Sequence, residues 1–253
     1  MKPTIVTCNF FLFKNNYFLR YWYEINFLEL DLKARDITSK YVPFSKGGSF
    51  VKWYGNIIYA IKLADLWTDS KVNKSVRRGD KEVYFKKCVG WSYMGGGNKK
   101  NFSILEGCVC GTGTPTILNH EENELLYVLG FLNTKIPEEF IKVFNPTLNT
   151  YISDICNLPY VMSKRYSQIV DIVKECIYIS KANWNAFETS WDFQKHSLLT
   201  HKGDSNSIEQ AFSNWLYFAE RQFNQLKENE EELNRIFIEI YGLQDELTPE
   251  VED

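Results

Sequence analysis

A long amphipathic pattern near the C-terminus constrains the fold of this chain more than any other feature. From Ile208 to Ile240, apolar residues recur at three- and four-residue spacing, which is typical of one buried helical face. Ser207 with Gln210 forms a capping-box signature at the start, and Gly242 stands where a left-handed residue ends a helix. Such a helix would be about 50 Å long at 1.5 Å per residue. Because a compact domain does not need that length, we expect a spacer or coiled-coil arm. The break in the pattern at Asn229 and Glu230 predicts that its far half is partly solvated or borrows a partner.

The stretch from Asn123 to Tyr160 predicts the scaffold of the domain. Leucines and a valine from 125 to 132 have helical spacing, and a second helical pattern starts near Pro137 and is stopped by Asn145-Pro146. Ile152, Ile155 and Leu158 then lie three apart, which predicts a single tight turn packed back on the helix. These residues contain no catalytic constellation, so we interpret them as a framework that holds other segments.

The remaining patterns predict an α+β fold. Residues 39–121 are interpreted as β-rich, with strands at 57–63, 82–86 and 89–93. Helices are expected at 16–23 and 166–179. With hydrophobic residues at 44% and aromatic residues at 16%, the chain can bury a substantial core, which argues against wholesale disorder. We therefore expect a β-rich domain with packed helices, followed by the long C-terminal helix.

The charges of the chain are strongly segregated, although the net charge is only -3. Residues 40–101 contain 13 Lys and Arg against four acids, whereas residues 203–253 contain 13 acids against three bases. A basic segment of this size is expected of a surface that binds a polyanion, and an ordinary solvated face is the alternative.

Two loops of the basic segment are candidates for contacts with a polyanion. Residues 71–80 form a polar, basic connection, and residues 95–101 join three glycines to Asn98, Lys99, Lys100 and Asn101. Glycines permit close backbone approach to a partner, and the lysines supply cations for phosphate groups. Trp53 and Tyr54 have two interpretations: stacking on an extruded base beside lysines, or packing in the core with a polar tip at its edge.

Several long motifs resemble a known family. They are Gly130-Phe131-Leu132-Asn133-Thr134-Lys135, Asn145-Pro146-Thr147-Leu148-Asn149, Asp154-Ile155-Cys156-Asn157-Leu158-Pro159, the glycine-containing stretch 46–56, Glu188-Thr189-Ser190-Trp191-Asp192-Phe193, and residues 223–230. Together they resemble the target-recognition region of PglX-like adenine-specific DNA methyltransferases from BREX phage-exclusion systems. The resemblance extends more distantly to type IIG restriction-modification enzymes and type I specificity subunits.

The resemblance implies a module that recognises a specific sequence in double-stranded DNA and has no catalytic activity of its own. Residues 1–38 would connect it to a methyltransferase domain, residues 39–202 would be the DNA target-recognition domain, and residues 203–253 would be a helical spacer or interaction arm. The methyltransferase domain, which is not in this chain, would bind S-adenosylmethionine, flip adenine and methylate it. The residues expected to contact DNA phosphates are Lys46, Lys52, Lys71, Lys74, Arg77, Arg78, Lys86, Lys87, Lys99 and Lys100. Asn98 and Asn101 are expected to read bases, because an amide can bond adenine through two hydrogen bonds.

Two other functions remain open on the sequence. The acidic C-terminal helix could make the chain a protein-interaction module of the same defence system, through other subunits or by self-association. A divergent S-adenosylmethionine-dependent methyltransferase is the third: Asn157-Leu158-Pro159-Tyr160 resembles the motif that grips the target amine but lacks its first proline. Cys110-Gly111-Thr112-Gly113-Thr114 is the nearest candidate cofactor loop, and it has no acidic residue placed before it. We expect no cofactor and no metal in this chain.

The six cysteines show no disulfide framework, and we interpret them as reduced thiols of a cytoplasmic protein. No stretch of about 18 apolar residues exists, so no membrane contact is expected.

Overall fold

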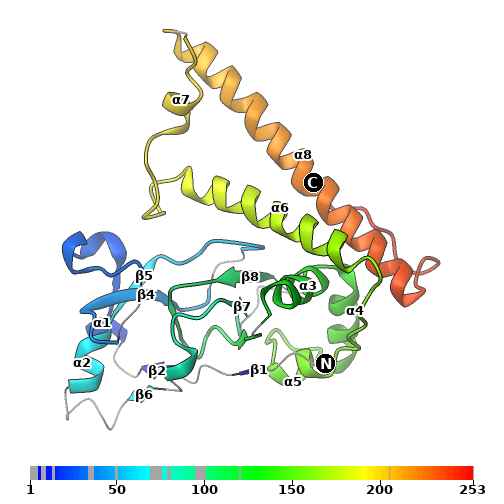
Figure 1. Ribbon diagram of the computed structural model, residues 1–253, viewed down its shortest axis with the longest axis horizontal. Coiled ribbons are helices and arrows are strands. Elements are labelled where there is room, and N and C mark those ends of the chain that lie inside the picture. Colours follow the sequence, from blue (N-terminus) through cyan, green and yellow to red (C-terminus); the bar gives the residue numbers. More distant parts are fainter. Residues whose placement is uncertain are drawn as a thin grey trace.

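The structure is a computed structural model that describes residues 5–6, 10–12, 15–33, 37–48, 51–68, 76–78, 81–94, 101–119, 121–204 and 206–252. It confirms the predicted α+β fold: three small sheets lie on one side of a layer of helices, and a long helix runs out beyond them (Figure 1). The strands are β1 (Ile5–Val6), β2 (Phe10–Leu12), β3 (Leu19–Tyr21), β4 (Tyr41–Ser45), β5 (Tyr59–Lys62), β6 (Val76–Arg78), β7 (Cys88–Trp91), β8 (Phe102–Leu105), β9 (Val109–Cys110) and β10 (Thr116–Ile117). The helices are α1 (Asn15–Phe18), α2 (Leu63–Thr68), α3 (Glu122–Leu132), α4 (Lys135–Phe144), α5 (Ile152–Cys156), α6 (Tyr166–Asn185), α7 (Ser197–Thr200) and α8 (Ile208–Tyr241), with 3-10 turns η1 (Trp22–Glu24), η2 (Phe27–Glu29) and η3 (Lys81–Val83).

The strands form two four-stranded sheets and one two-stranded sheet. One sheet has the order β1-β10-β7-β8, another has the order β3-β5-β4-β9, and β2 pairs with β6. All pairs are antiparallel except β4 with β9. Strands β7 and β8 are neighbours along the chain and pair from Cys88↔Leu105 to Trp91↔Phe102, so the connection between them starts and ends beside the Trp91–Phe102 pair.

Helix α3 is the centre of the larger hydrophobic core. Every residue from Leu125 to Leu132 is buried, as expected of a helix that is apolar all round. It packs against β7, β8, α6 and α8. Gly130 makes the approach to α6 possible, because a Cβ atom there would lie 2.7 Å from Cγ2 of Val173. The sheet β3-β5-β4-β9 belongs to a second core cluster, built around Phe18, Val42, Ile61 and Val109.

Two sequence-based predictions about local structure are wrong. Residues 82–86 do not form a strand: Lys81–Val83 is a 3-10 turn, and Phe85 has a positive φ of 66°. Residues 16–23 do not form one helix. Only Asn15–Phe18 is helical, and Leu19–Tyr21 pairs with β5 as an edge strand. In both places tertiary contacts override the local propensity, which is a weak determinant in short segments.

Helix α8 has the predicted bounds, with Ser207 as its N-cap and Gly242 at its C-terminal end. The Ser207 side chain accepts a hydrogen bond from the Gln210 backbone N–H over 3.4 Å, and Gly242 is left-handed with a φ of 69°. The expected distribution of solvation along the helix is wrong, however. The half after Asn229 is buried, with Leu233, Ile236 and Phe237 in the core, whereas the first half carries exposed apolar side chains. Figure 1 shows this first half standing away from the sheets, joined to α6 through α7.

Candidate functional site

Three loops that are distant in the sequence meet at one end of the sheets. The Gly48 backbone N–H donates to Oγ of Ser92 over 3.2 Å. The Tyr93 backbone N–H donates to the Gly113 carbonyl over 2.9 Å, and the Gly111 N–H donates to the Ser45 carbonyl over 2.9 Å. We call this arrangement of residues 45–48, 92–94 and 111–114 the loop cluster. It forms the base of the hairpin that carries the three glycines.

Glycines at two positions let the loops of this cluster touch. Gly47 has a φ of +79°, and a Cβ atom there would lie 2.3 Å from the Gly113 carbonyl oxygen. A Cβ atom at Gly113 would lie 2.4 Å from the carbonyl oxygen of Lys46. The turn weighed above as a cofactor loop is therefore packed backbone to backbone against another loop. Its residues do not fit an S-adenosylmethionine site.

The predicted scaffold supports the loop cluster from the other side. The Thr150 backbone N–H donates to the Tyr93 carbonyl over 3.0 Å, and the Trp91 indole N–H donates to the Thr150 carbonyl over 3.1 Å. Asp154 is buried, and its Oδ2 accepts from the Asn145 side chain and from the Tyr151 N–H, each over 2.8 Å. The motifs around Asn145 and Asp154 thus fix the backbone where the glycine-rich hairpin begins.

The predicted cations have different surroundings. Lys46 and Lys86 are exposed, and Asn101, the residue before β8, is partly exposed. Lys87 pairs with Glu122, and Lys52 pairs with Glu230 of α8 over 2.6 Å. The hydrogen bond from Lys87 lowers the pKa of Glu122, which favours the charged form of that carboxyl. Lys52 thus lies on the side of α8, whereas β6 lies on the side of the sheets away from α8 (Figure 1). The structure does not bring Lys52 and the strand of Arg77 and Arg78 to one surface.

Other expected contact residues lie outside the described part of the chain. These are Lys71, Lys74, Asn98, Lys99 and Lys100. For Arg77 and Arg78 only the backbone is described, which pairs with Phe11 and Phe10 of β2. Their roles stay predictions.

Trp53 occupies the position expected from the core interpretation. It is 1% exposed, its φ is 69°, and its indole N–H donates to Oε1 of Glu230 over 2.6 Å. A base cannot stack on a ring enclosed in this way. Tyr54 is partly exposed, with the Lys181 ammonium 5.2 Å from its ring centroid. Burial raises the pKa of Tyr54 to about 12.

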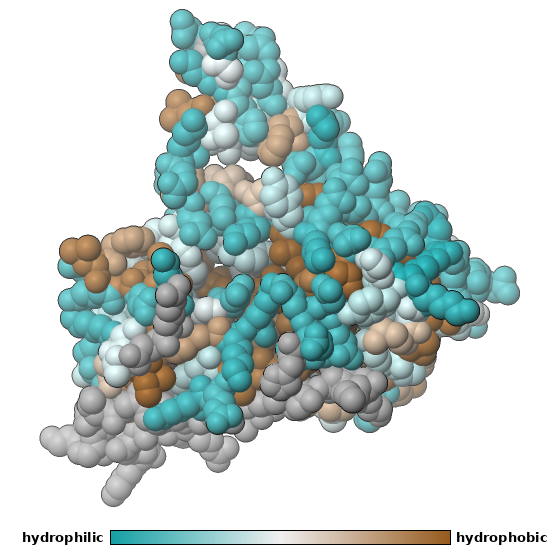
Figure 2. Space-filling model, viewed as in Figure 1, coloured by the Kyte–Doolittle hydropathy of each residue, from teal (hydrophilic) through white to brown (hydrophobic). Residues whose placement is uncertain are grey.

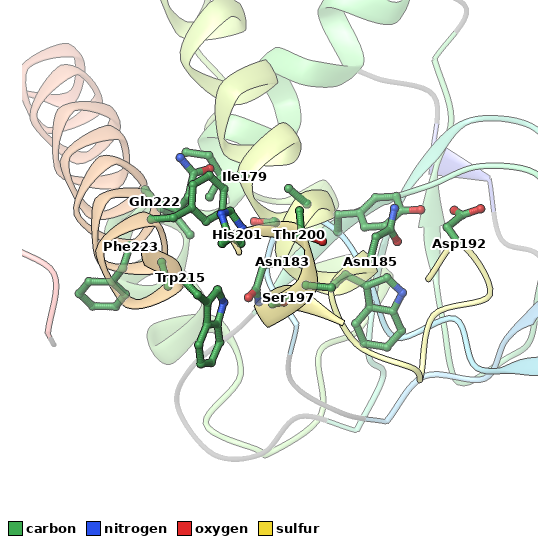
Figure 3. A pocket seen from close by; sticks show the side chains of 18 of the residues that line it. Ile179, Asn183, Asn185, Asp192, Ser197, Thr200, His201, Trp215, Gln222 and Phe223 are labelled. Atoms are coloured by element: carbon green, nitrogen blue, oxygen red, sulfur yellow. The ribbon is translucent and has the colours of Figure 1, made fainter. Parts of the chain in front are cut away.

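An aromatic groove that the sequence analysis missed adjoins Tyr54. It has a volume of about 830 Å³ and lies between α6, the segment leading to α7, and the first half of α8. In Figure 3, Trp215, Gln222 and Phe223 line it from α8, with the Phe223 ring turned outward, Asn183 and Asn185 come from α6, and Asp192 lies at the far end. Trp215 and Phe223 belong to the apolar pattern from Ile208 to Ile240, which predicts a single buried face. In the part of the chain that the structure describes, the first half of this face is not covered by another element, so it forms one wall of a groove. A sequence does not show which part of an apolar face is left uncovered.

The first half of α8 also carries apolar side chains outside the groove. Exposed large residues here are Ile208, Phe212, Leu216 and Tyr217. Exposed apolar residues gather a second time at η1 and η2, where Tyr23, Phe27 and Leu28 face solvent. Figure 2 shows hydrophobic surface at its left edge, where the blue helical turns lie in Figure 1. Contiguous patches of this kind are typical of interaction surfaces.

The described thiols are all free, and Cys88, Cys108, Cys110 and Cys176 are buried. The Cys108 and Cys110 sulfurs are 3.9 Å apart, and their hydrogen bond, with burial, raises the pKa of the Cys108 thiol. Within the described ranges, no group of three His, Cys, Asp or Glu side chains is placed to hold a metal ion. None of the helices described here combines the length and apolarity needed to cross a membrane.

Comparisons with known proteins point to one group of enzymes. No protein-family profile matches the chain. It is 36% identical over 256 aligned residues to the adenine-specific methyltransferase PglX of Lacticaseibacillus casei (strain Zhang), a match that covers 94% of this chain and 21% of PglX. It is 30% identical over 233 aligned residues to the adenine-specific methyltransferase BrxX of Escherichia coli O9:H4 (strain HS), which covers 91% of this chain and 19% of BrxX. The chain thus spans about one fifth of the length of these curated relatives.

A solved structure shares the fold. The type IIL restriction-modification enzyme MmeI, solved in complex with DNA, matches 98% of this chain with a TM-score of 0.52 at 11% sequence identity; the match covers 34% of the MmeI chain. The resemblance expected from the sequence motifs is therefore confirmed: over more than nine-tenths of its length, this chain is similar to one region of the adenine-specific methyltransferases PglX and BrxX.

Proposed function

We propose that this chain is the DNA-recognition portion of a PglX-like adenine-specific methyltransferase. Its role is to position duplex DNA, while the transfer of the methyl group belongs to the rest of the enzyme, where S-adenosylmethionine binds. The observation that carries the proposal is the likeness to one fifth of two adenine-specific methyltransferases, in a fold shared with an enzyme that was solved on DNA.

The loop cluster supports this role. Its backbone is held by hydrogen bonds and by contacts that only glycine allows. The hairpin between β7 and β8 is therefore anchored on a rigid base. Rigid support is what a reading loop needs, because base contacts depend on geometry. We assign phosphate contacts to Lys46, Lys71, Lys74, Arg77, Arg78, Lys86, Lys99 and Lys100. Lys52 and Lys87 are omitted because Glu230 and Glu122 already hold their ammonium groups.

A salt series tests the proposal. A fluorescent duplex should bind with an affinity that falls on a log-log plot by about 0.9 for each phosphate neutralised. Changing Lys99 and Lys100 together to Ala should flatten the slope. Lys202→Ala is the matched control, since Lys202 is exposed on the segment before α8 and lies outside the basic segment. An affinity that is independent of salt would contradict the proposal.

Base reading requires a second comparison. Asn101→Ala should cost about 1–3 kcal/mol on the recognised sequence and little on other sequences. An equal loss on every duplex would make Asn101 a backbone contact.

The exposed half of α8 favours a second candidate function, a protein-interaction module. Phe212, Leu216 and Phe223 are 47%, 52% and 53% exposed. Sedimentation equilibrium separates the two functions. A self-associating chain that binds no duplex at any salt concentration would favour the interaction module.

A further inference from the structure

Three tyrosines form a stack at one edge of the sheet β3-β5-β4-β9. Tyr21 ends β3 and Tyr59 begins β5, and the two residues are register partners with ring centroids 4.8 Å apart. The ring of Tyr23 lies parallel to that of Tyr21, with an interplanar angle of 6° and a centroid distance of 5.2 Å. Tyr23 is exposed and the other two rings are partly exposed, so the stack lies at the surface.

The hydroxyl groups of the two paired tyrosines lie together. The Tyr59 hydroxyl donates to the Tyr21 hydroxyl over 3.4 Å, which leaves the proton of Tyr21 free for another acceptor. A tyrosine hydroxyl loses its proton only at about pH 10, so the Tyr21 hydroxyl is a donor at neutral pH. The carboxylate of Glu24 is engaged with the Tyr21 backbone N–H over 2.9 Å.

Lys46 adds a positive charge to the same place. Its ammonium lies 4.8 Å from the centroid of the Tyr59 ring, and its charge also acts on Tyr21, whose pKa it lowers against the larger effect of Tyr59. Lys46 is exposed, and among the described residues no carboxylate forms an ion pair with it.

Lys62, on the same sheet, provides the contrast. Its ammonium also lies over a tyrosine, 5.7 Å from the ring centroid of Tyr17, but it is 2.5 Å from the carboxylate of Asp65. Within the described residues, the ammonium group of Lys46 therefore has no carboxylate beside it and lies near a hydroxyl donor, whereas the ammonium group of Lys62 is already paired with Asp65.

We propose that Lys46, Tyr21 and Tyr59 bind a phosphodiester group of the DNA backbone. Ammonium and tyrosine hydroxyl groups are among the donors that proteins direct at DNA phosphates. Lys46 is also part of the loop cluster, so this contact would fix the duplex beside the glycine-rich hairpin. The inference rests on the proposed function and adds to it a phosphate site that includes two tyrosines.

The experiment measures the anisotropy of a labelled duplex over a salt series with the whole chain. Lys46→Gln should weaken binding and reduce the log-log slope by about 0.9, the value for one neutralised phosphate. The double variant Tyr21→Phe with Tyr59→Phe keeps the stacked rings and removes only the hydroxyls. It should weaken binding about fivefold, as expected for a lost hydrogen bond, with an unchanged slope. Lys62→Gln is the matched control and should retain the affinity of the unmodified chain.

Methylphosphonate substitution in the duplex then locates the phosphate. Neutralising one backbone position should weaken binding by the unmodified chain and have no further effect on the Lys46→Gln variant. If the unmodified chain binds no duplex, the proposed function fails and this inference fails with it. A different outcome is that the unmodified chain binds with the expected salt dependence, while Lys46→Gln and the double tyrosine variant bind the duplex as tightly as it does. In that case the inference alone is overturned.

Discussion

Oε1 of Glu230 lies 2.6 Å from the indole nitrogen of Trp53, so a carboxylate of α8 holds a tryptophan of the loop before β5. Oε2 of the same side chain lies 2.6 Å from the ammonium of Lys52. One acidic residue thus fixes two neighbours whose sequence positions are almost 180 residues earlier. The apparent break in the apolar pattern of α8 is therefore the position at which the helix binds the loop before β5.

Removing this carboxylate should destabilise the fold. Glu230→Ala leaves a partly buried ammonium and a buried indole N–H without their acceptor, and we expect the free energy of unfolding to fall by about 2–4 kcal/mol. Urea unfolding followed by tryptophan fluorescence measures the change. Glu228→Ala is the control, because Glu228 is exposed on the same helix, and its effect should stay within about 0.5 kcal/mol. Equal stabilities of the two variants would contradict the anchoring role.

A second prediction concerns Gly55, which lies against α6. Its φ is +130°, and a Cβ atom there would be 2.9 Å from Cε3 of Trp184. Gly55→Ala therefore adds both backbone strain and a clash with a rigid ring, and should cost about 2–4 kcal/mol. Gly203→Ala separates the two effects. Gly203 has a φ of +59°, but Nδ2 of Asn214 would be 3.8 Å from the new Cβ, so only about 1 kcal/mol should be lost. Thermal unfolding of both variants tests the difference.

The sequence predicts best those elements whose signals are local. Ser207 and Gly242 mark the ends of α8 through cap chemistry, and Asn145-Pro146 marks the end of α4. These signals depend on neighbouring residues only, so a single sequence contains them. The strand Leu19–Tyr21 depends instead on its pairing with β5, and the chain after the 3-10 turn Lys81–Val83 is held by hydrogen bonds between Phe85 and residues 107–108; both segments were predicted wrongly.

The candidate site is predictable in its parts but not in its assembly. The glycines of Lys46-Gly47-Gly48 and of Gly111-Thr112-Gly113 indicate close backbone approach in any loop. That the two loops approach each other is a property of the fold. Likewise, a count of charges along the segment gives Lys46 and Lys52 the same weight. In the structure, Glu230 neutralises Lys52 but not Lys46. Counting charges along a segment therefore overstates the cations that one surface offers.

A third prediction concerns thiol reactivity. Cys156 is exposed, whereas Cys176 is buried and burial raises the pKa of its thiol, which suppresses the reactive thiolate. At neutral pH, iodoacetamide should modify Cys156 quickly, and the four buried cysteines should react only after unfolding in urea. Peptide mass spectrometry identifies the modified sites, with Cys156→Ser as the control. Rapid modification of Cys176 in the folded chain would contradict the packing of α6 against α8.

A fourth prediction concerns alkaline pH. Burial raises the pKa of Tyr54 and of Tyr241 to about 12, above the ordinary value of 10.0. Since these pKa values are higher in the folded state, the folded chain holds more protons than the unfolded chain between about pH 10 and pH 12. The resulting stability is fully present below pH 10 and is lost as the pH rises through 12. Urea unfolding at stepped pH measures the loss, and Tyr54→Phe should make it smaller. A stability that rises over this range would contradict the burial of these phenols.

The two halves of α8 should respond differently to the same substitution. Leu233 is 1% exposed in the larger core, so Leu233→Ala should cost about 2–5 kcal/mol through lost burial and a residual cavity. Leu216 is 52% exposed on the first half, and Leu216→Ala should cost less than about 1 kcal/mol. Urea unfolding gives both values, and sedimentation equilibrium of the Leu216 variant shows whether this face joins two chains. If both substitutions destabilised the chain equally at a concentration where it is monomeric, the first half of α8 would have to pack on the domain, and its apolar face could not serve as a surface for a partner.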